Sequence, residues 1–201
     1  MKRRQILSLA ASGYALMPLM LQAQAKAQAQ RPTQAGLPDI ALLLRAGACA
    51  VMLRHAQTDP GIGDPPGFRL DRCSTQRNLS ATGREQARQI GQWFKVNGLK
   101  PASVQTSAWC RCKETAELGF GQFAVLGALG SFFDNHNRQE SEDSQTRELR
   151  ARLQTIPAGR FEVWVTHQVN ITALLGEATA MGEAMLVGSK AQVLGRTFLV
   201  R

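Results

Sequence analysis

The sequence contains no internal repeat, no second zone of distinct composition and no nucleic-acid-binding motif. The absence of repeats and of a composition boundary predicts one domain. Aromatic residues make up only 6% of the 201 residues, and they form no pattern with the basic ones, so we expect no nucleic-acid partner. The formal net charge of +9 favours anionic substrates or a negatively charged envelope surface. We interpret it first as a solvated basic surface.

A clean membrane-spanning run is also absent. The stretch from Ile6 to Leu21 is mostly apolar but is interrupted by Ser, Gly, Tyr and Pro, and it is therefore a poor membrane span. Because it follows a basic start, Lys2-Arg3-Arg4, and precedes a small-x-small site, Ala23-Gln24-Ala25, it predicts a bacterial export signal over residues 1–25. A retained anchor is the less favoured alternative.

The export signal sets the predicted organisation of the rest of the chain. Residues 26–36, rich in Ala and Gln, indicate a flexible leader, and residues 37–201 form the predicted domain. The mature protein would be periplasmic, would carry a charge of +6 and would have no integral membrane segment. Arg3-Arg4 also resembles the twin-arginine export pattern, so the general secretory and twin-arginine routes both stay open.

Cysteine is scarce, with four residues in the chain. The pair Cys110-x-Cys112 has too few suitable ligands nearby for a zinc site, and we expect neither a metal nor a cofactor. Four cysteines do fit an exported protein in an oxidising compartment, where we expect one disulfide.

Two apolar runs end in histidine. Ala50-Val51-Met52-Leu53 is short and leads through Arg54-His55 into a turn-rich loop, which is typical of a buried strand. The run from Phe161 to Thr166 has the same design and ends at His167, and the apolar stretch from Ile171 to Ala180 then indicates a helix. In open α/β sheets, ligands bind beyond the carboxyl ends of the strands, where helix N-termini also favour anions. We predict that both histidines reach one phosphate-handling site.

A third unit adds a cation to this site. The residues from Ala102 to Ser107 predict a strand, and Ser107 is expected to cap a helix that begins near Ala108. Arg111 then falls in the first turns of that helix. Guanidinium groups match phosphate oxygens bidentately, so Arg54 and Arg111 are candidate phosphate ligands.

The chain resembles the histidine phosphatase superfamily, the proteins with the phosphoglycerate-mutase-like fold. Four elements occur in the family's order, with alanine in the first where glycine is usual: Leu53-Arg54-His55-Ala56, Leu79-Ser80-Ala81-Thr82-Gly83-Arg84-Glu85-Gln86-Ala87, Ser107-Ala108-Trp109-Cys110-Arg111 with Glu114-Thr115-Ala116, and Val165-Thr166-His167. The match spans roughly residues 50 to 173, and the order of the four elements makes the likeness specific, since Arg-His alone is a weak signal.

The resemblance implies a covalent mechanism without a metal. His55 would attack phosphorus to form a phosphohistidine, which water then hydrolyses. Arg54, Arg111 and His167 would hold the nonbridging oxygens and stabilise charge in the transition state. Thr58 is a further candidate donor to phosphate, although Thr-Asp-Pro-Gly is also a common turn composition.

The general acid of this family is missing from its usual place. Many relatives carry a glutamate after the third strand, where this chain has Ser131. Asp134 is our replacement candidate, because the preceding Phe132-Phe133 could desolvate a nearby carboxyl group. A polar stretch with Glu140, Glu142 and Asp143 follows, and a solvated loop is its simpler interpretation. A substrate with a good leaving group, such as a phosphohistidine or an acyl phosphate, would need no acid. His136 lies in a polar loop without a matching motif and is expected to be exposed.

The disulfide can be placed on the same framework. Cys73 lies in the long loop after His55, and Cys110 and Cys112 flank Arg111. A bridge there would fasten the substrate loop to the helix that carries Arg111. Cys73–Cys110 is the pairing that we favour.

The remaining patterns predict an α/β fold, a three-layer helix–sheet–helix sandwich with a largely parallel sheet. Gly83 to Phe94 is amphipathic and followed by Gly98, which indicates a helix and its end. Glu148 to Leu153 predicts another helix, and Val193 to Val200 a closing strand paired with Met185 to Val187.

Three functions fit these features. The first is a phosphomonoester hydrolase for a small phosphorylated substrate, such as a phosphorylated sugar of the envelope. The second is a phosphohistidine phosphatase, which suits the missing acid but clashes with export. The third is a noncatalytic phosphate- or glycan-binding protein, against which the retained His55 argues. The chain is short for a phosphoglycerate mutase, and the pocket loops carry no motif that identifies the substrate.

Overall fold

Alternating side chains of the first strand divide the core into two layers. In β1 (Cys49–Arg54), Cys49, Val51 and Leu53 pack on one face of the sheet, while Ala50 and Met52 pack on the other. A strand that is buried on both faces has an uninterrupted apolar sequence, as this one does. The computed structural model describes residues 39–133 and 138–200, which belong to one compact unit.

The sheet has six strands in the order β3-β2-β4-β1-β5-β6. The pairs β3–β2, β2–β4 and β4–β1 are parallel, whereas β5 is antiparallel to both β1 and β6. The other strands are β2 (Ser103–Thr106), β3 (Ala124–Val125), β4 (Phe161–Thr166), β5 (Glu183–Gly188) and β6 (Val193–Phe198). The predicted pairing of the closing strand with Met185 to Val187 is confirmed.

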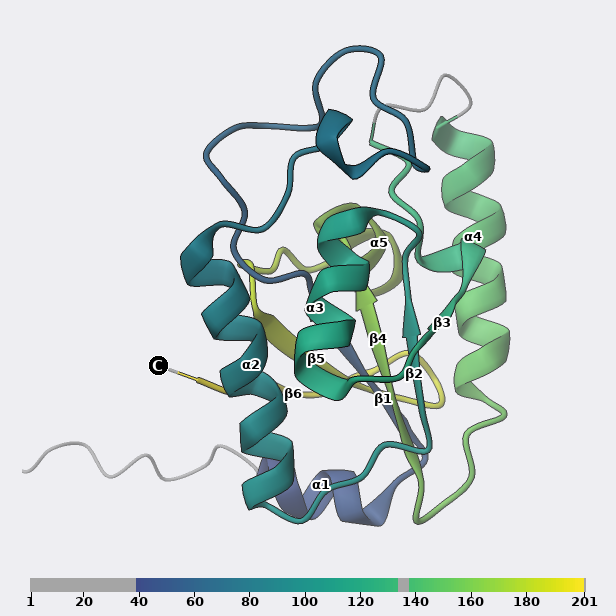
Figure 1. Cartoon of the computed structure of the whole chain (residues 1–201). Helices are drawn as coiled ribbons and strands as arrows, with labels where there is room; N and C mark the ends of the chain where they lie inside the picture. The colour runs from purple at the N-terminus through teal and green to yellow at the C-terminus, as the bar shows by residue number, and fades with distance from the viewer. Residues whose placement is uncertain (1–38, 134–137, 201) are drawn as a thin grey trace, which may run out of the picture. The chain divides into compact units, whose positions relative to one another are not determined.

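Helices cover both faces of this sheet (Figure 1). One layer contains α1 (Ile40–Ala46), α2 (Ala81–Val96) and α3 (Cys110–Phe120), and the other contains α4 (Arg138–Leu153) and α5 (Gln168–Leu175). The predicted helix–sheet–helix sandwich with a largely parallel sheet is therefore confirmed.

The N-terminus of α2 holds the loop that follows β1. Ser80 caps the helix by accepting a hydrogen bond from the Gly83 amide at 3.0 Å. A Cβ atom at Gly83 would lie 1.8 Å from the carbonyl oxygen of Gln57, so only glycine allows this approach. The helix ends, as predicted, before Gly98, which has a φ of 62°.

Three helix boundaries differ from the sequence expectations. The helix predicted at Glu148 begins at Arg138. The sequence did not indicate its first turns, because they are polar and show no apolar periodicity. The helix after His167 ends at Leu175 rather than Ala180, because Gly176 adopts the left-handed conformation. α3 begins at Cys110 rather than near Ala108. Among residues 39–133 and 138–200, no helix is long and apolar enough to cross a membrane.

Candidate active site

Three neighbouring parallel strands deliver the candidate residues to one edge of the sheet. β4 lies between β2 and β1, so Ser107, His167 and His55, which follow these strands, are brought side by side. The two histidine rings have centroids 5.6 Å apart. Both are buried, with 2% of His55 and 4% of His167 exposed. Figure 1 shows the loop between β1 and α2 arching over this edge, where α4 also begins.

The ring of His55 has a defined tautomer. Its Nδ1 lies 2.9 Å from the carbonyl oxygen of Ala56, and a carbonyl oxygen can only accept, so Nδ1 carries the proton. Nε2 is left with a free lone pair. Burial, followed by the charge of Arg111, lowers the pKa of His55 to about 3. The ring is therefore neutral near pH 7, as a nucleophile must be.

The ring of His167 has both nitrogens in contact with protein groups. Nδ1 accepts from Arg111 Nη2 at 3.4 Å, and Nε2 lies 2.8 Å from the hydroxyl of Ser107. Because a guanidinium only donates, Nε2 carries the proton and donates to Ser107. Burial is the main cause that lowers the pKa of His167 well below its ordinary value, and Arg111 adds to it.

Ser107 does not cap α3, contrary to the sequence prediction. The N-cap position is Trp109, whose backbone amide donates to the Ser107 hydroxyl at 3.3 Å. The side chain of Gln76 instead accepts from the Cys110 amide at 2.9 Å. Ser107 therefore orients the His167 ring. Gln76, from the loop before α2, accepts the hydrogen bond of a backbone amide that has no partner within the first turn of α3.

The N-terminus of α5 faces the same site. His167 occupies its N-cap position and makes no side-chain cap. Gln168 and Val169, in the first turn, line the pocket. Free amide groups and the helix dipole at this end favour an anion, in agreement with the strand–histidine–helix pattern of the sequence.

Arg54 and Arg111 are both brought to the pocket. Arg54 Nη1 donates to the Gln168 side chain at 2.8 Å and to the Thr179 carbonyl. Arg111 forms a buried ion pair with Asp64 at 2.8 Å, in which 4% and 2% of the two side chains are exposed. Asp64, which the sequence reasoning missed, also accepts from the Trp109 indole at 3.0 Å and from a loop amide.

Arg77 is a further residue that the sequence reasoning missed. It lines the pocket, and its Nη1 donates at 2.8 Å to both the Thr58 hydroxyl and the Gly61 carbonyl. Burial and the neighbouring Arg111 lower its pKa. Its position two residues before the Leu79-Ser80 element was the available signal, but a lone arginine in a loop has no periodicity to distinguish it.

Three arginines that line this pocket each have one unsatisfied donor. The buried Nε atoms of Arg54, Arg77 and Arg111 have no hydrogen-bond partner within the described residues. Buried donors of this kind are rare and indicate a ligand or a strained site. Burial, and then repulsion from Arg77 and Arg111, lowers the pKa of Arg54. An oxyanion bound between these guanidinium groups would relieve their mutual repulsion.

The pocket has a volume of about 620 Å³. Its basic part is formed by the arginines and histidines above. Ile62, Phe132, Phe133 and Met181 contribute apolar surface, and α4 contributes Arg138 and Glu142. The cavity is large enough for a phosphate group together with an organic part of the substrate.

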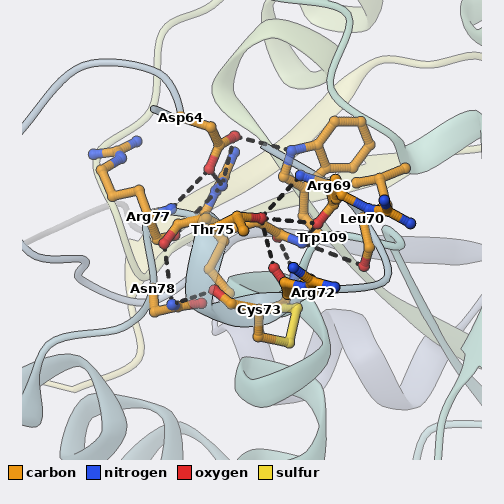
Figure 2. Close-up of a disulfide and its surroundings, with 12 residues drawn as sticks. Asp64, Arg69, Leu70, Arg72, Cys73, Thr75, Arg77, Asn78 and Trp109 are labelled. Carbon is orange, nitrogen blue, oxygen red and sulfur yellow. Dashed lines mark hydrogen bonds and ion pairs between the residues drawn. A yellow bond between two sulfur atoms is a disulfide. The ribbon is translucent and has the colours of Figure 1, made fainter. Parts of the chain in front are cut away.

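The predicted disulfide Cys73–Cys110 is confirmed. It joins a 3₁₀ turn in the loop to the first residue of α3, directly beside Arg111. Figure 2 shows the bridge next to a network in which Asp64 lies between Arg77 and the Trp109 indole. Cys49 and Cys112 are free and buried.

Three other sequence candidates have different outcomes. Thr58 is buried but does not line the pocket, since its hydroxyl contacts Arg77 and Met181. A direct contact between Thr58 and phosphate stays a prediction. Asp134 and His136 lie outside the described residues.

Comparisons with known proteins agree with this architecture. Residues 50–125 match the family model of the histidine phosphatase superfamily, branch 1. No curated protein sequence matches the chain. A mycobacterial glucosyl-3-phosphoglycerate phosphatase is 20% identical, with a TM-score of 0.50, over 70% of this chain and 89% of that one. This likeness shows the fold alone, and it supports the predicted phosphoglycerate-mutase-like fold.

Two further solved structures are similar over most of their length. The protein histidine phosphatase SixA complexed with tungstate is 13% identical, with a TM-score of 0.48, over 73% of this chain and 93% of that one. The protein TTHB049 from Thermus thermophilus is 20% identical, with a TM-score of 0.48, over 74% of this chain and 98% of that one.

We expect Asp64→Asn to destabilise the protein by about 3 kcal/mol, because a buried guanidinium loses its counter-charge. The measurement is urea unfolding followed by tryptophan fluorescence. Asp71→Asn is the matched control, because the Arg69–Asp71 pair is solvent-exposed, and it should cause no measurable change. Equal stability of the wild type and Asp64→Asn would contradict the structural role of the buried pair.

Stability should fall as the pH is lowered, because of His55. The unfolded chain takes up a proton at this ring near pH 6.5, whereas the folded pKa is about 3. The contribution is thus complete above pH 6.5 and is lost as pH falls towards 3, with about 2 to 3 kcal/mol lost by pH 4.5. Urea unfolding of the wild type and His55→Gln should show a shallower pH dependence in the variant. Parallel curves would refute this account.

Proposed function

We propose, on the premise that residues 50–125 match the histidine phosphatase superfamily (branch 1), that this chain is a phosphomonoester hydrolase with a phosphohistidine intermediate. The observation that carries the proposal is the cluster of three guanidinium groups with unsatisfied Nε donors around a neutral, buried His55. The substrate would be a small phosphorylated molecule.

His55 would act as the nucleophile. The Ala56 carbonyl holds the proton on Nδ1, so the lone pair of Nε2 is free to attack phosphorus. The N–P bond forms as the bond between phosphorus and the leaving oxygen breaks. Water then attacks phosphorus, the N–P bond breaks, and phosphate is released. Covalent catalysis of this kind divides one difficult displacement into two easier steps.

Arg54, Arg77 and Arg111 would hold the nonbridging oxygens. Their fixed positive charge stabilises the transition state without a metal, because preorganised donors need not reorient during the reaction. His167 would border the same oxygens as a neutral ring, and its Nε2–H group could donate its hydrogen bond to a phosphate oxygen instead of to Ser107. The α5 amides add donors at the same end.

A phosphorylated sugar of the envelope is the substrate class that we favour. The apolar surface of Phe132 and Phe133 and the polar groups of Arg138 and Glu142 line one pocket with the basic cluster, which suits a phosphate bound to a partly polar organic group. A phosphohistidine phosphatase is the alternative, supported by the missing glutamate after β3. A noncatalytic phosphate- or glycan-binding protein is the third candidate.

We also propose that the protein is exported to the periplasm. The confirmed Cys73–Cys110 disulfide supports an oxidising compartment, and the basic, then apolar, N-terminal sequence supports a signal over residues 1–25.

His55→Ala should reduce phosphate release at least about 10³-fold, because the nucleophile is lost. The measurement uses protein starting at Lys26 with p-nitrophenyl phosphate, a panel of sugar phosphates and a phosphohistidine peptide. His136→Ala is the matched control, as the remaining histidine outside the motifs, and should retain activity. Acid-labile radiolabel on wild type but not on His55→Ala would identify the intermediate.

The substrate panel distinguishes the three candidates. Turnover of the phosphohistidine peptide alone would favour the second function over the first. A folded wild-type protein that binds inorganic phosphate but turns over none of the substrates would favour the binding protein and reject the hydrolase.

Bacterial expression of the full chain should yield a periplasmic protein that begins at Lys26, as measured by mass spectrometry of the fractionated cells. Replacement of Arg3 and Arg4 by lysine should block export only if the twin-arginine route is used. Full-length protein retained in the membrane fraction would instead support the anchor.

A further inference from the structure

The proposed reaction needs a proton for the leaving oxygen. An alkoxide is a poor leaving group, and general acid catalysis typically contributes about 10²- to 10⁴-fold. The residue at the position of the family's glutamate is Ser131, which lines the pocket but is too weak an acid for this role. The chain must supply the carboxyl group from elsewhere if it hydrolyses alkyl phosphates.

Within the described residues, Glu142 is the only carboxylate that lines the pocket. Asp64 is not a competing candidate, because it lies outside the lining and its oxygens accept from Arg111, Trp109 and the Arg77 amide. In contrast, Glu142 forms no ion pair or side-chain hydrogen bond in the described part of the chain.

The helical period of α4 explains why Glu142 faces inwards. Leu149 and Leu153 pack in the core beneath the sheet, and Gln145, one turn earlier, contacts Asn170 at 2.9 Å. Glu142 lies three residues before Gln145 on the same side and is half-buried. Glu140 and Asp143, on the same helix, are exposed. The polar stretch is therefore not a solvated loop, and only one of its carboxylates reaches the pocket.

We propose that Glu142 is the general acid of this enzyme, in place of the glutamate that follows β3 in relatives; this inference rests on the proposed phosphatase function. As His55 Nε2 forms its bond to phosphorus, the electron pair of the breaking P–O bond goes to the leaving oxygen. The Glu142 carboxyl gives its proton to that oxygen, and an alcohol departs. In the second step the Glu142 carboxylate takes a proton from water as the water oxygen attacks phosphorus and the N–P bond breaks.

The test compares leaving groups in the wild type and Glu142→Gln. p-Nitrophenolate departs without a proton, whereas the alkoxide of glycerol 2-phosphate requires one. We expect Glu142→Gln to lose about 10²-fold or more in kcat/KM for glycerol 2-phosphate. The burst of p-nitrophenol, which reports the first step alone, should change less than about 10-fold. A merely structural role would lower both rates equally.

Matched variants complete the design. Glu140→Gln changes an exposed carboxylate of the same helix and should behave as the wild type on both substrates. Circular dichroism and thermal unfolding check that each variant folds. Equal losses on both substrates, no loss on either, or a leaving-group effect confined to Asp134→Asn would each overturn the proposal. Failure of the phosphatase function is distinguishable, because the wild type itself would then turn over neither substrate, and the role of Glu142 would fall with it.

Discussion

The buried pair between Asp64 and Arg111 is the interaction on which the site depends. The guanidinium groups of Arg54, Arg77 and Arg111 share one pocket, and burial together with mutual repulsion opposes their charge, as the lowered pKa values of Arg54 and Arg77 indicate. The buried carboxylate of Asp64 compensates one of these three charges. The remaining two positive charges stay available to an anion. Compensation of all three would leave a stable but electrostatically neutral pocket, and compensation of none would leave buried charges without partners.

The position of Asp64 also explains how the long loop is held. Asp64 contacts Trp109 and Arg111, which lie at the start of α3, and Gln76 satisfies the Cys110 amide. The Cys73–Cys110 bridge joins the same two segments covalently. Loops are usually the least fixed part of a domain, but this one carries Arg77, which lines the pocket and which, in the proposed role of a phosphate ligand, must be held within fractions of an ångström. The ion pair, the side-chain cap and the disulfide together provide that rigidity.

The sequence predicts the parts of the site that follow regular structure. Apolar runs that end in His55 and His167 indicate buried strands, and parallel strands bring their carboxyl ends together, so the meeting of the two histidines follows from local patterns. Asp64 and Arg77 could not be found in this way, because a loop has no period and their roles arise only from contacts with α3. The disulfide was predictable because its two ends could be placed on an element and on the loop. The helix cap was wrong because Ser107 bonds to His167 instead.

The two halves of the proposed reaction place different demands on the fold. Binding phosphate requires several donors converging on one point, and here the ends of β1 and β4 and the N-termini of α3 and α5 meet at that point together with the loop that carries Arg77, so this part is tied to the sheet. A general acid needs only one carboxyl group within reach of the leaving oxygen, which in an in-line displacement departs on the side of phosphorus opposite His55. Any element that borders that side of the pocket can supply it. A chain that has Ser131 after β3 can therefore keep the same chemistry if the inner face of α4 carries the carboxyl group. Because α4 lines the pocket with Arg138 and Glu142, the helix that would donate the proton would also restrict which alcohols fit.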